Sequence, residues 1–263
     1  MDQLSIIVPC YNEEQTVELF YTEVEKMVQY MPDIQTDYLF VDDGSTDRTL
    51  EKVKELRVRD KRVKYISFSR NFGKEAAMYA GLEHVSGEYA VIMDADLQDP
   101  PMLLPEMLRI IREEQYDSVA TRRVTRKGEP PIRSFCARQF YHIMNKISDV
   151  ELMDGARDYR FMTRKYVNAV LSLKEFNRFS KGIFGWVGFR TKWLEFENQE
   201  RSAGETKWSF WKLVQYSLQG IVSFSETPLY MASVLGGGMC GVALLAIIFI
   251  IVRQLLFGGS AFG

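Results

Sequence analysis

The chain has 263 residues, 46% of them hydrophobic and 26% charged, which is enough to bury one substantial core. Its formal net charge of −2 argues against a protein that coats nucleic acid, so we expect no nucleic-acid partner. The cysteines Cys10, Cys136 and Cys240 match no metal or redox spacing, which favours a reducing compartment. Met1 to Ser5 contains no basic segment ahead of an apolar core, so we expect no secretory signal peptide.

Apolar runs and helical patterns alternate along the first half of the chain. The runs at 4–8, 38–41, 63–68, 87–93 and 117–121 predict strands. Helices are predicted between them, with Asn12 as a candidate N-cap of the first, which ends near Met31, and with others ending near His84 and Glu114. This alternation predicts βαβ units and an α/β fold with a mainly parallel sheet. Ligands of such sheets bind outside the carboxyl ends of the strands.

Acidic residues follow two of these predicted strands. Asp42 and Asp43 come after the second strand, and Asp94 and Asp96 come at the end of the fourth. Because side chains alternate along a strand, Asp94 and Asp96 are expected to point the same way and to form a two-pronged oxygen site. Such a site suits Mg²⁺ or Mn²⁺, which take their remaining ligands from water and substrate phosphates. The alternative is that Asp-x-Asp only closes a strand before the turn at Pro100.

Glycine-rich phosphate-binding motifs are absent. The segment 71–74, Asn-Phe-Gly-Lys, has neither the dinucleotide fingerprint nor the P-loop spacing. A nucleotide site on this chain would therefore depend on the metal to hold the phosphates.

The middle of the chain contains an amphipathic pattern over about 122–148. Apolar residues between Ile132 and Ile147 recur at helical spacing among basic residues, which from periodicity alone is typical of a helix in a bilayer interface and equally of a surface helix that covers a core. The apolar C-terminal segment described below favours the interfacial helix. The basic residues Arg122, Arg126, Lys127 and Arg133 surround a short loop at 128–131 that could close over a lipid phosphate. A second helix rich in aromatic residues, at 208–227, is expected to lie along the interface.

The C-terminal region has the composition of a membrane span. No charged residue occurs from Thr227 to Val252, which predicts a transmembrane helix at 228–257 in preference to a buried core helix. The glycines at 236–238 and 241 would allow close packing of membrane helices, and hence a homo-oligomer. Basic residues between Arg190 and Lys212 outnumber the single Arg253 beyond the span, which predicts a plasma-membrane protein whose domain ahead of the span is cytoplasmic. After the tail at 258–263 we expect a second span to be missing from this chain.

Four motifs occur in an order that resembles the family 2 glycosyltransferases of the GT-A fold. They are Ile-Ile-Val-Pro-Cys-Tyr-Asn-Glu at 6–13, Val-Asp-Asp-Gly-Ser-Thr-Asp at 41–47, Met-Asp-Ala-Asp-Leu-Gln-Asp-Pro at 93–100 and Gly-Glu-Thr-Lys-Trp-Ser at 204–209. The branch that the chain is most similar to is the polyprenyl-phosphate glycosyltransferases, which include dolichol-phosphate mannose synthases and bacterial undecaprenyl-phosphate glucosyltransferases. The resemblance covers almost the whole chain and implies a GT-A catalytic domain at 1–207.

This resemblance implies roles for individual residues. Nucleotide-sugar contacts would come from Pro9, Tyr11, Glu13, Asp42, Asp43, Asp94, Ala95, Asp96, Arg201 and Lys207. The metal ligands would be Asp96, Gln98 and Asp94, and the acceptor phosphate would bind Arg122 and Arg133, although Ala137 stands where the family usually has a serine. Asp158 would orient the sugar, because a phosphate acceptor is already ionised and needs no general base. Its alternative role is to cap a loop.

The function that these features predict is an inverting, metal-dependent transfer of a hexose. The donor would be a nucleotide sugar, UDP-glucose or UDP-N-acetylglucosamine, and the acceptor undecaprenyl or another polyprenyl phosphate. Two alternatives are a processive polysaccharide synthase and a membrane-bound sensor of nucleotide sugars. The synthase's Gln-x-x-Arg-Trp element is absent from this sequence, and a sensor would not need Asp94, Asp96 and Gln98.

Overall fold

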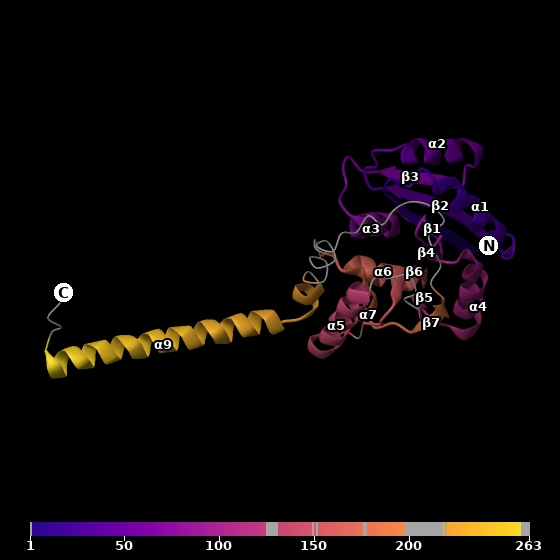
Figure 1. The fold of residues 1–263 in the computed structure, drawn as a ribbon. Coiled ribbons are helices and arrows are strands. Elements are labelled where there is room, and N and C mark those ends of the chain that lie inside the picture. The colour runs from indigo at the N-terminus through magenta and orange to yellow at the C-terminus, as the bar shows by residue number, and fades with distance from the viewer. Residues whose placement is uncertain are drawn as a thin grey trace.

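The computed structural model describes residues 2–124, 131–148, 150, 152–175, 178–197, 218 and 220–258, with only the backbone described for 131–137. Helix α9 projects from a compact α/β body that contains all the strands (Figure 1).

One seven-stranded sheet forms the centre of the body, in the order β3-β2-β1-β4-β6-β5-β7. Strands β1 to β4 are parallel, β7 is parallel to β5, and β6 runs antiparallel to both of its neighbours. The predicted mainly parallel sheet is thus confirmed. The strands are β1 (Asp2–Cys10), β2 (Ile34–Asp42), β3 (Val63–Ser67), β4 (Tyr89–Ile92), β5 (Ser118–Arg123), β6 (Ala156–Thr163) and β7 (Thr191–Phe196).

Helices cover both faces of this sheet, because its strands carry apolar side chains on both sides. Leu4, Ile6 and Val8 of β1 point into one core, and Ile7 points into the other. The first core is covered by α1 (Val17–Val28), α2 (Thr49–Arg59) and α4 (Leu104–Glu114), which follows the short 3₁₀ helix η1 (Pro101–Leu103). The second is covered by α3 (Lys74–His84), α6 (Arg164–Ser172) and α7 (Ser180–Trp186).

The C-terminal half differs most from what the periodicity predicted. Strands β6 and β7 were not predicted, whereas the amphipathic helix is present as α5 (Pro131–Ile147). The first helix starts at Val17, so the predicted N-cap at Asn12 is wrong, since that residue lies in a left-handed turn at φ 53°. Of the predicted interfacial helix at 208–227, residues 208–217 and 219 lie outside the described part of the chain, and the described residues up to Phe224 are helical.

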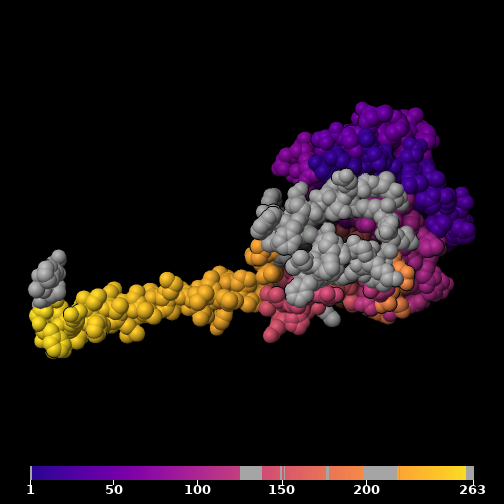
Figure 2. Space-filling model, viewed as in Figure 1, coloured from indigo at the N-terminus to yellow at the C-terminus, as the bar shows by residue number. Residues whose placement is uncertain are grey.

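Helix α9 (Thr227–Phe257) is 31 residues long, and its most apolar 18-residue window has a mean hydropathy of 2.6, so it is long and apolar enough to cross a membrane. None of its most apolar window is buried in the protein, which separates it from the core helices of the body, as Figure 2 also shows. The predicted span at 228–257 is therefore present as a continuous exposed helix.

Candidate functional site

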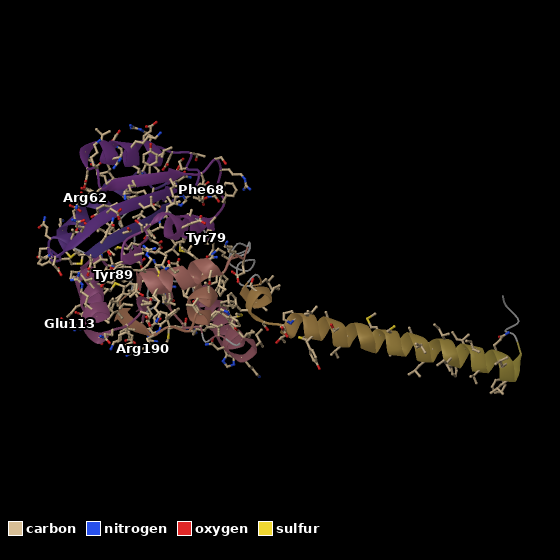
Figure 3. All side chains as sticks on the ribbon, turned by 180° about the vertical axis from the view of Figure 1, so that it is seen from behind. Arg62, Phe68, Tyr79, Tyr89, Glu113 and Arg190 are labelled. Atoms are coloured by element: carbon tan, nitrogen blue, oxygen red, sulfur yellow. The ribbon has the colours of Figure 1, made fainter. Side chains whose placement is uncertain are left out.

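The carboxyl ends of β1, β2 and β4 meet at one edge of the sheet. In Figure 3 β3 runs from Arg62 toward Phe68, and the strands parallel to it point the same way. Cys10 is paired with Asp42, and the Asp43 backbone N–H donates to the Cys10 carbonyl oxygen at 2.8 Å. The Met93 N–H likewise donates to the Ile7 carbonyl oxygen at 3.0 Å. These bonds place the loops after three strands side by side.

Two of these loops are joined by hydrogen bonds. The Asn12 N–H donates to the Ser45 hydroxyl at 2.9 Å, and the Thr46 N–H donates to the Asn12 side-chain oxygen at 2.8 Å. The Glu13 N–H donates to the Thr49 hydroxyl at 2.6 Å. Tyr11 and Glu13 therefore lie on a loop that these bonds hold in place, and Pro9 lies just before it in β1. All three residues are partly exposed at the sheet edge, where a planar ligand could rest.

Asp42 and Asp43 have different surroundings, although they are neighbours. The Asp42 carboxylate accepts from the Ser45 N–H and the Ser67 hydroxyl, both at 3.2 Å. The Asp43 carboxylate accepts from the N–H groups of Phe72 (2.7 Å) and Gly73 (2.9 Å). Burial raises the pKa of Asp43, although these two N–H groups oppose the rise. In this structure Asp43 holds the loop that leads into α3.

Gly44 supports this arrangement, since its φ is +68° and a Cβ there would lie 2.4 Å from the Arg70 carbonyl carbon. We expect Gly44→Ala to lower the free energy of unfolding by about 3 kcal/mol, because it adds left-handed strain to a backbone clash. The apparent melting temperature in detergent should fall by about 6–12 °C. Gly236→Ala is the matched control, since no atom lies within 4 Å of a Cβ there. Equal melting temperatures for the two variants would contradict this prediction.

A cluster of charges lies beside Asp94 at the end of β4. The Lys74 ammonium contacts Asp94 at 2.7 Å and Asp158 at 2.5 Å. The Arg157 guanidinium contacts Asp99 at 2.8 Å and Asp94 at 3.6 Å. We call these five residues the charge cluster. It links α3, β6 and the loop after β4, so that Asp94 and Asp158, far apart in the sequence, share one cation.

The charge cluster shifts the pKa of its members. Burial alone would raise the pKa of Asp158, but the charges of Lys74 and Lys181 hold it well below its ordinary value. Burial would lower the pKa of Lys74, and the two carboxylates instead raise it. Burial raises the pKa of Asp99 to about 6 despite the opposing charge of Arg157. Asp158 is therefore an ionised, paired carboxylate at neutral pH, and a poor general base.

The predicted metal ligands lie beyond the end of their strand. Strand β4 stops at Ile92, so Asp94 and Asp96 lie in a turn, and the alternation expected from a strand does not set their directions. The turn is tightened by Leu97, whose φ is +57°, and the Gln98 N–H donates to Asp96 Oδ1 at 3.1 Å. Ala95 is buried within it.

The donor set nevertheless fits Mg²⁺ or Mn²⁺. A carboxylate on Asp96 and an amide on Gln98 are hard oxygen donors two residues apart, and Asp96 remains 7% exposed at the sheet edge. No group of three His, Cys, Asp or Glu side chains converges as a metal cage within the described residues. An ion held here would need oxygen atoms from a substrate phosphate.

The remaining predicted residues are placed only in part. Arg122 donates to Glu195 at 3.0 Å and to the Met153 sulfur at 3.1 Å, so it would exchange partners to bind a phosphate. Arg133 lies in the first part of α5, at 131–137, for which only the backbone is described. Arg201 and Lys207 lie outside the described residues, and their roles stay predictions.

Lys74 and Arg157 were missed by the sequence reasoning. Each residue had a signal in the sequence. Lys74 ends the loop after the third predicted strand, at the same sheet edge, and Arg157 directly precedes Asp158. Neither signal identifies the ion-pair partners, because strand β6, which places Arg157 and Asp158, was not predicted.

A family model and the similar proteins of known sequence all point to glycosyltransferases. Residues 5–171 match the family model for glycosyl transferase family 2. CsbB of Bacillus subtilis, named as a candidate glycosyltransferase, is 47% identical over 250 residues, which cover 94% of this chain and 74% of the relative. Bactoprenol glucosyl transferase of Shigella phage SfV is 36% identical over 261 residues, covering 99% of this chain and 84% of the relative.

Solved structures share the fold at low identity. The mannosyltransferase PcManGT from Pyrobaculum calidifontis, in complex with GDP-Man and Mn²⁺, has a TM-score of 0.58 at 18% identity, over 84% of this chain and 64% of that one. Glucosyl-3-phosphoglycerate synthase from Mycobacterium tuberculosis, in complex with Mn²⁺, UDP-glucose and phosphoglyceric acid, has a TM-score of 0.54 at 19% identity, over 84% and 77%. These likenesses confirm the predicted GT-A fold.

Proposed function

Because this chain belongs to glycosyl transferase family 2, we propose that it transfers glucose from UDP-glucose to undecaprenyl phosphate at the cytoplasmic face of the plasma membrane. The relatives named as bactoprenol glucosyl transferases support both the sugar and the acceptor. The exposed apolar helix α9 supports a reaction beside a bilayer.

The observation that carries this proposal is the charge cluster next to the Asp96 turn. Asp94 belongs to the cluster and lies two residues from Asp96, so a diphosphate held at Asp96 would bring the attached sugar close to Asp94 and Asp158. Pro9, Tyr11, Glu13 and Asp43 lie at the same sheet edge, where the uridine would extend. The uridine, the diphosphate and the sugar would then lie in a row along the carboxyl ends of the strands.

The residues of the chain would act by binding and orienting. A phosphate oxygen of the acceptor attacks the anomeric carbon, the bond from that carbon to the diphosphate oxygen breaks, and its electrons leave with UDP, so the configuration inverts. Lys74 donates to the Asp158 carboxylate at 2.5 Å, and Asp158 held in this way would contact a sugar hydroxyl. A divalent ion, when bound at Asp96 and Gln98, would stabilise the negative charge on the leaving diphosphate. We also propose that Arg201 and Lys207 bind that diphosphate, and that Arg122 and Arg133 bind the acceptor phosphate.

The donor is tested by incubating the chain in detergent with undecaprenyl phosphate and a panel of radiolabelled nucleotide sugars. The proposal predicts that label from UDP-glucose enters the organic phase faster than label from UDP-N-acetylglucosamine, UDP-galactose or GDP-mannose. Preferential transfer from another donor would reject glucose as the sugar and leave the glycosyltransferase assignment intact.

Removal of divalent ions should abolish this transfer. With EDTA we expect kcat to fall by at least about 100-fold, because the leaving diphosphate loses its main stabilising charge. Excess Mg²⁺ or Mn²⁺ should restore the rate, and the ratio of the restored rates identifies the better ion. Undiminished transfer in EDTA would contradict a metal at Asp96.

A further inference from the structure

A cavity of about 230 Å³ lies on the far side of the charge cluster, between α5, α7, β6 and β7. Arg157 belongs to both, since it lines the cavity and contacts Asp99 and Asp94. We call this hollow the cationic cavity. Its lining residues are Tyr141, Leu152, Met153, Ala156, Arg157, Arg160, Lys181, Phe184, Gly185, Phe189, Thr191 and Trp193.

The charge of this lining has one sign. It contains three cationic side chains, Arg157, Arg160 and Lys181, and no Asp or Glu among the described residues. A hollow of this kind attracts an anion, and the carboxylates of the charge cluster lie outside it. Asp94 and Asp158 repel an anionic substrate that approaches them. The three cations of the cavity would offset that repulsion along this path.

Arg160 forms a buried part of the wall. Its side chain is 4% exposed, packs on the Phe184 ring at 4.6 Å and donates to the hydroxyls of Ser118 (3.1 Å) and Tyr166 (3.2 Å). Among the described residues its Nε has no hydrogen-bond partner, and no carboxylate forms an ion pair with it, although the charge of Asp158 acts on it from farther away. Burying a guanidinium without a carboxylate in contact costs free energy, and an anion bound in the cavity would lower that cost.

Lys181 connects the cavity to the reacting groups. It lies on α7, its ammonium is 3.3 Å from the Tyr141 hydroxyl, and its charge helps to lower the pKa of Asp158. Lys181 is therefore the cation best placed to hold an anion between the cavity and Asp158.

The apolar walls continue toward the membrane segment. Tyr141 and Leu152 line the cavity and also belong to an apolar cluster that includes Ile221 and Phe224. Phe224 lies three residues before α9 and packs against Trp186 of α7, with ring centroids 6.4 Å apart. A hydrocarbon chain leaving the cavity along these walls would reach α9.

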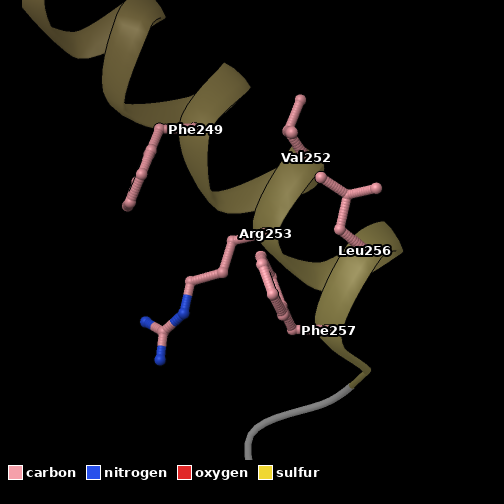
Figure 4. A pocket seen from close by; sticks show the side chains of 5 residues that line it. All are labelled: Phe249, Val252, Arg253, Leu256 and Phe257. Carbon is pink, nitrogen blue, oxygen red and sulfur yellow. The ribbon is translucent and has the colours of Figure 1, made fainter.

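A second hollow, lined by Phe249, Val252, Arg253, Leu256 and Phe257, differs in kind (Figure 4). All five residues come from the last turns of α9. It is a groove on one apolar helix, far along the chain from every predicted site residue.

We propose, on the basis of the function proposed above, that the cationic cavity receives the acceptor's phosphate with its first isoprene unit, and that Lys181 is a binding residue for that phosphate. Lys181 would act together with Arg122, which lies outside the lining but contacts the lining residue Met153 at 3.1 Å. Cationic and aromatic walls together match an anion attached to a hydrocarbon. Arg157 lines the cavity, precedes Asp158 in the chain and contacts Asp94, so a phosphate bound in the cavity would lie near a sugar held by those two carboxylates.

The test compares KM values for undecaprenyl phosphate and UDP-glucose in Lys181→Met and Lys181→Arg. Lys181→Met should raise KM for the lipid about 10- to 100-fold, since a charge-assisted hydrogen bond is lost, and should leave KM for UDP-glucose within about twofold. Lys181→Arg should recover most of the lost affinity. Geranyl phosphate should compete with the lipid in the wild type and much more weakly in Lys181→Met, whereas geraniol and inorganic phosphate alone should compete poorly with both.

Lys192→Met is the matched control, because Lys192 is on β7 beside the cavity-lining Thr191 and Trp193 but pairs with Glu114 at 3.6 Å. It should change neither KM. An unchanged KM for the lipid in Lys181→Met, or an equal rise in both KM values, would overturn the assignment of Lys181 while the wild-type transfer still stands. No transfer of label to lipid by the wild type would instead reject the proposed function.

Discussion

Asp96→Asn is expected to lower kcat for glucosyl transfer by about 100- to 1,000-fold while the protein stays folded. The amide keeps the size of the side chain and can still accept from the Gln98 N–H, which lies 3.1 Å from Asp96 Oδ1. It removes the negative charge that would hold the divalent ion against the diphosphate. Initial rates of label transfer, with the melting temperature as the check on folding, measure the effect.

The matched control for this variant is Asp33→Asn. Asp33 precedes β2 at the opposite edge of the sheet, is mostly exposed and pairs with Arg112. Surface pairs of this kind contribute about 0–1 kcal/mol, so neither rate nor stability should change much. If Asp96→Asn kept wild-type turnover and wild-type dependence on Mg²⁺, Asp96 would not be a metal ligand.

Lys74→Met is expected to reduce both activity and stability. Without the ammonium, Asp94 and Asp158 face each other with less compensating charge. Removing one partner of a fully buried pair costs about 3–5 kcal/mol, and because Lys74 is partly exposed we expect about 2 kcal/mol. The melting temperature should fall by about 4–8 °C, and kcat should fall about 100-fold as Asp158 loses its orientation.

Two further variants separate charge from packing at this position. Lys74→Arg keeps a cation and should retain more stability than Lys74→Met. Lys26→Met removes an exposed lysine that pairs with Glu23 and should leave activity and stability near wild type. A Lys74→Met protein as active as Lys74→Arg would show that the charge cluster plays no part in the reaction.

The sheet edge could be predicted from the sequence because its signals are local. Apolar runs predicted β1 to β5, and the residues that follow those runs, such as Asp43 and Asp96, lie at the carboxyl ends of the strands. The amphipathic pattern of α5 and the uncharged run of α9 were similarly readable, because helix period and span length are properties of single segments.

The charge cluster could not be predicted in the same way. Asp158 was predicted to orient the sugar, but its pairing with Lys74 depends on β6, an antiparallel strand inserted between β4 and β5. Its sequence, Ala-Arg-Asp-Tyr-Arg-Phe-Met-Thr, alternates too weakly for a strand to be recognised. The partly exposed Arg157 and the buried Arg160 are held by partners from other segments, which the local pattern does not show. The strand alternation assumed for Asp94 and Asp96 failed because β4 ends two residues before Asp94.

The central claim is that this chain adds a single hexose from a nucleotide sugar to a polyprenyl phosphate. The most direct measurement is mass spectrometry of the lipid recovered after the chain in detergent has been incubated with UDP-glucose, Mg²⁺ and undecaprenyl phosphate. We predict a product that carries one hexose for each undecaprenyl phosphate, with UDP released in equal amount. A lipid left unmodified by the wild-type chain, or a product bearing a long glycan, would contradict the account.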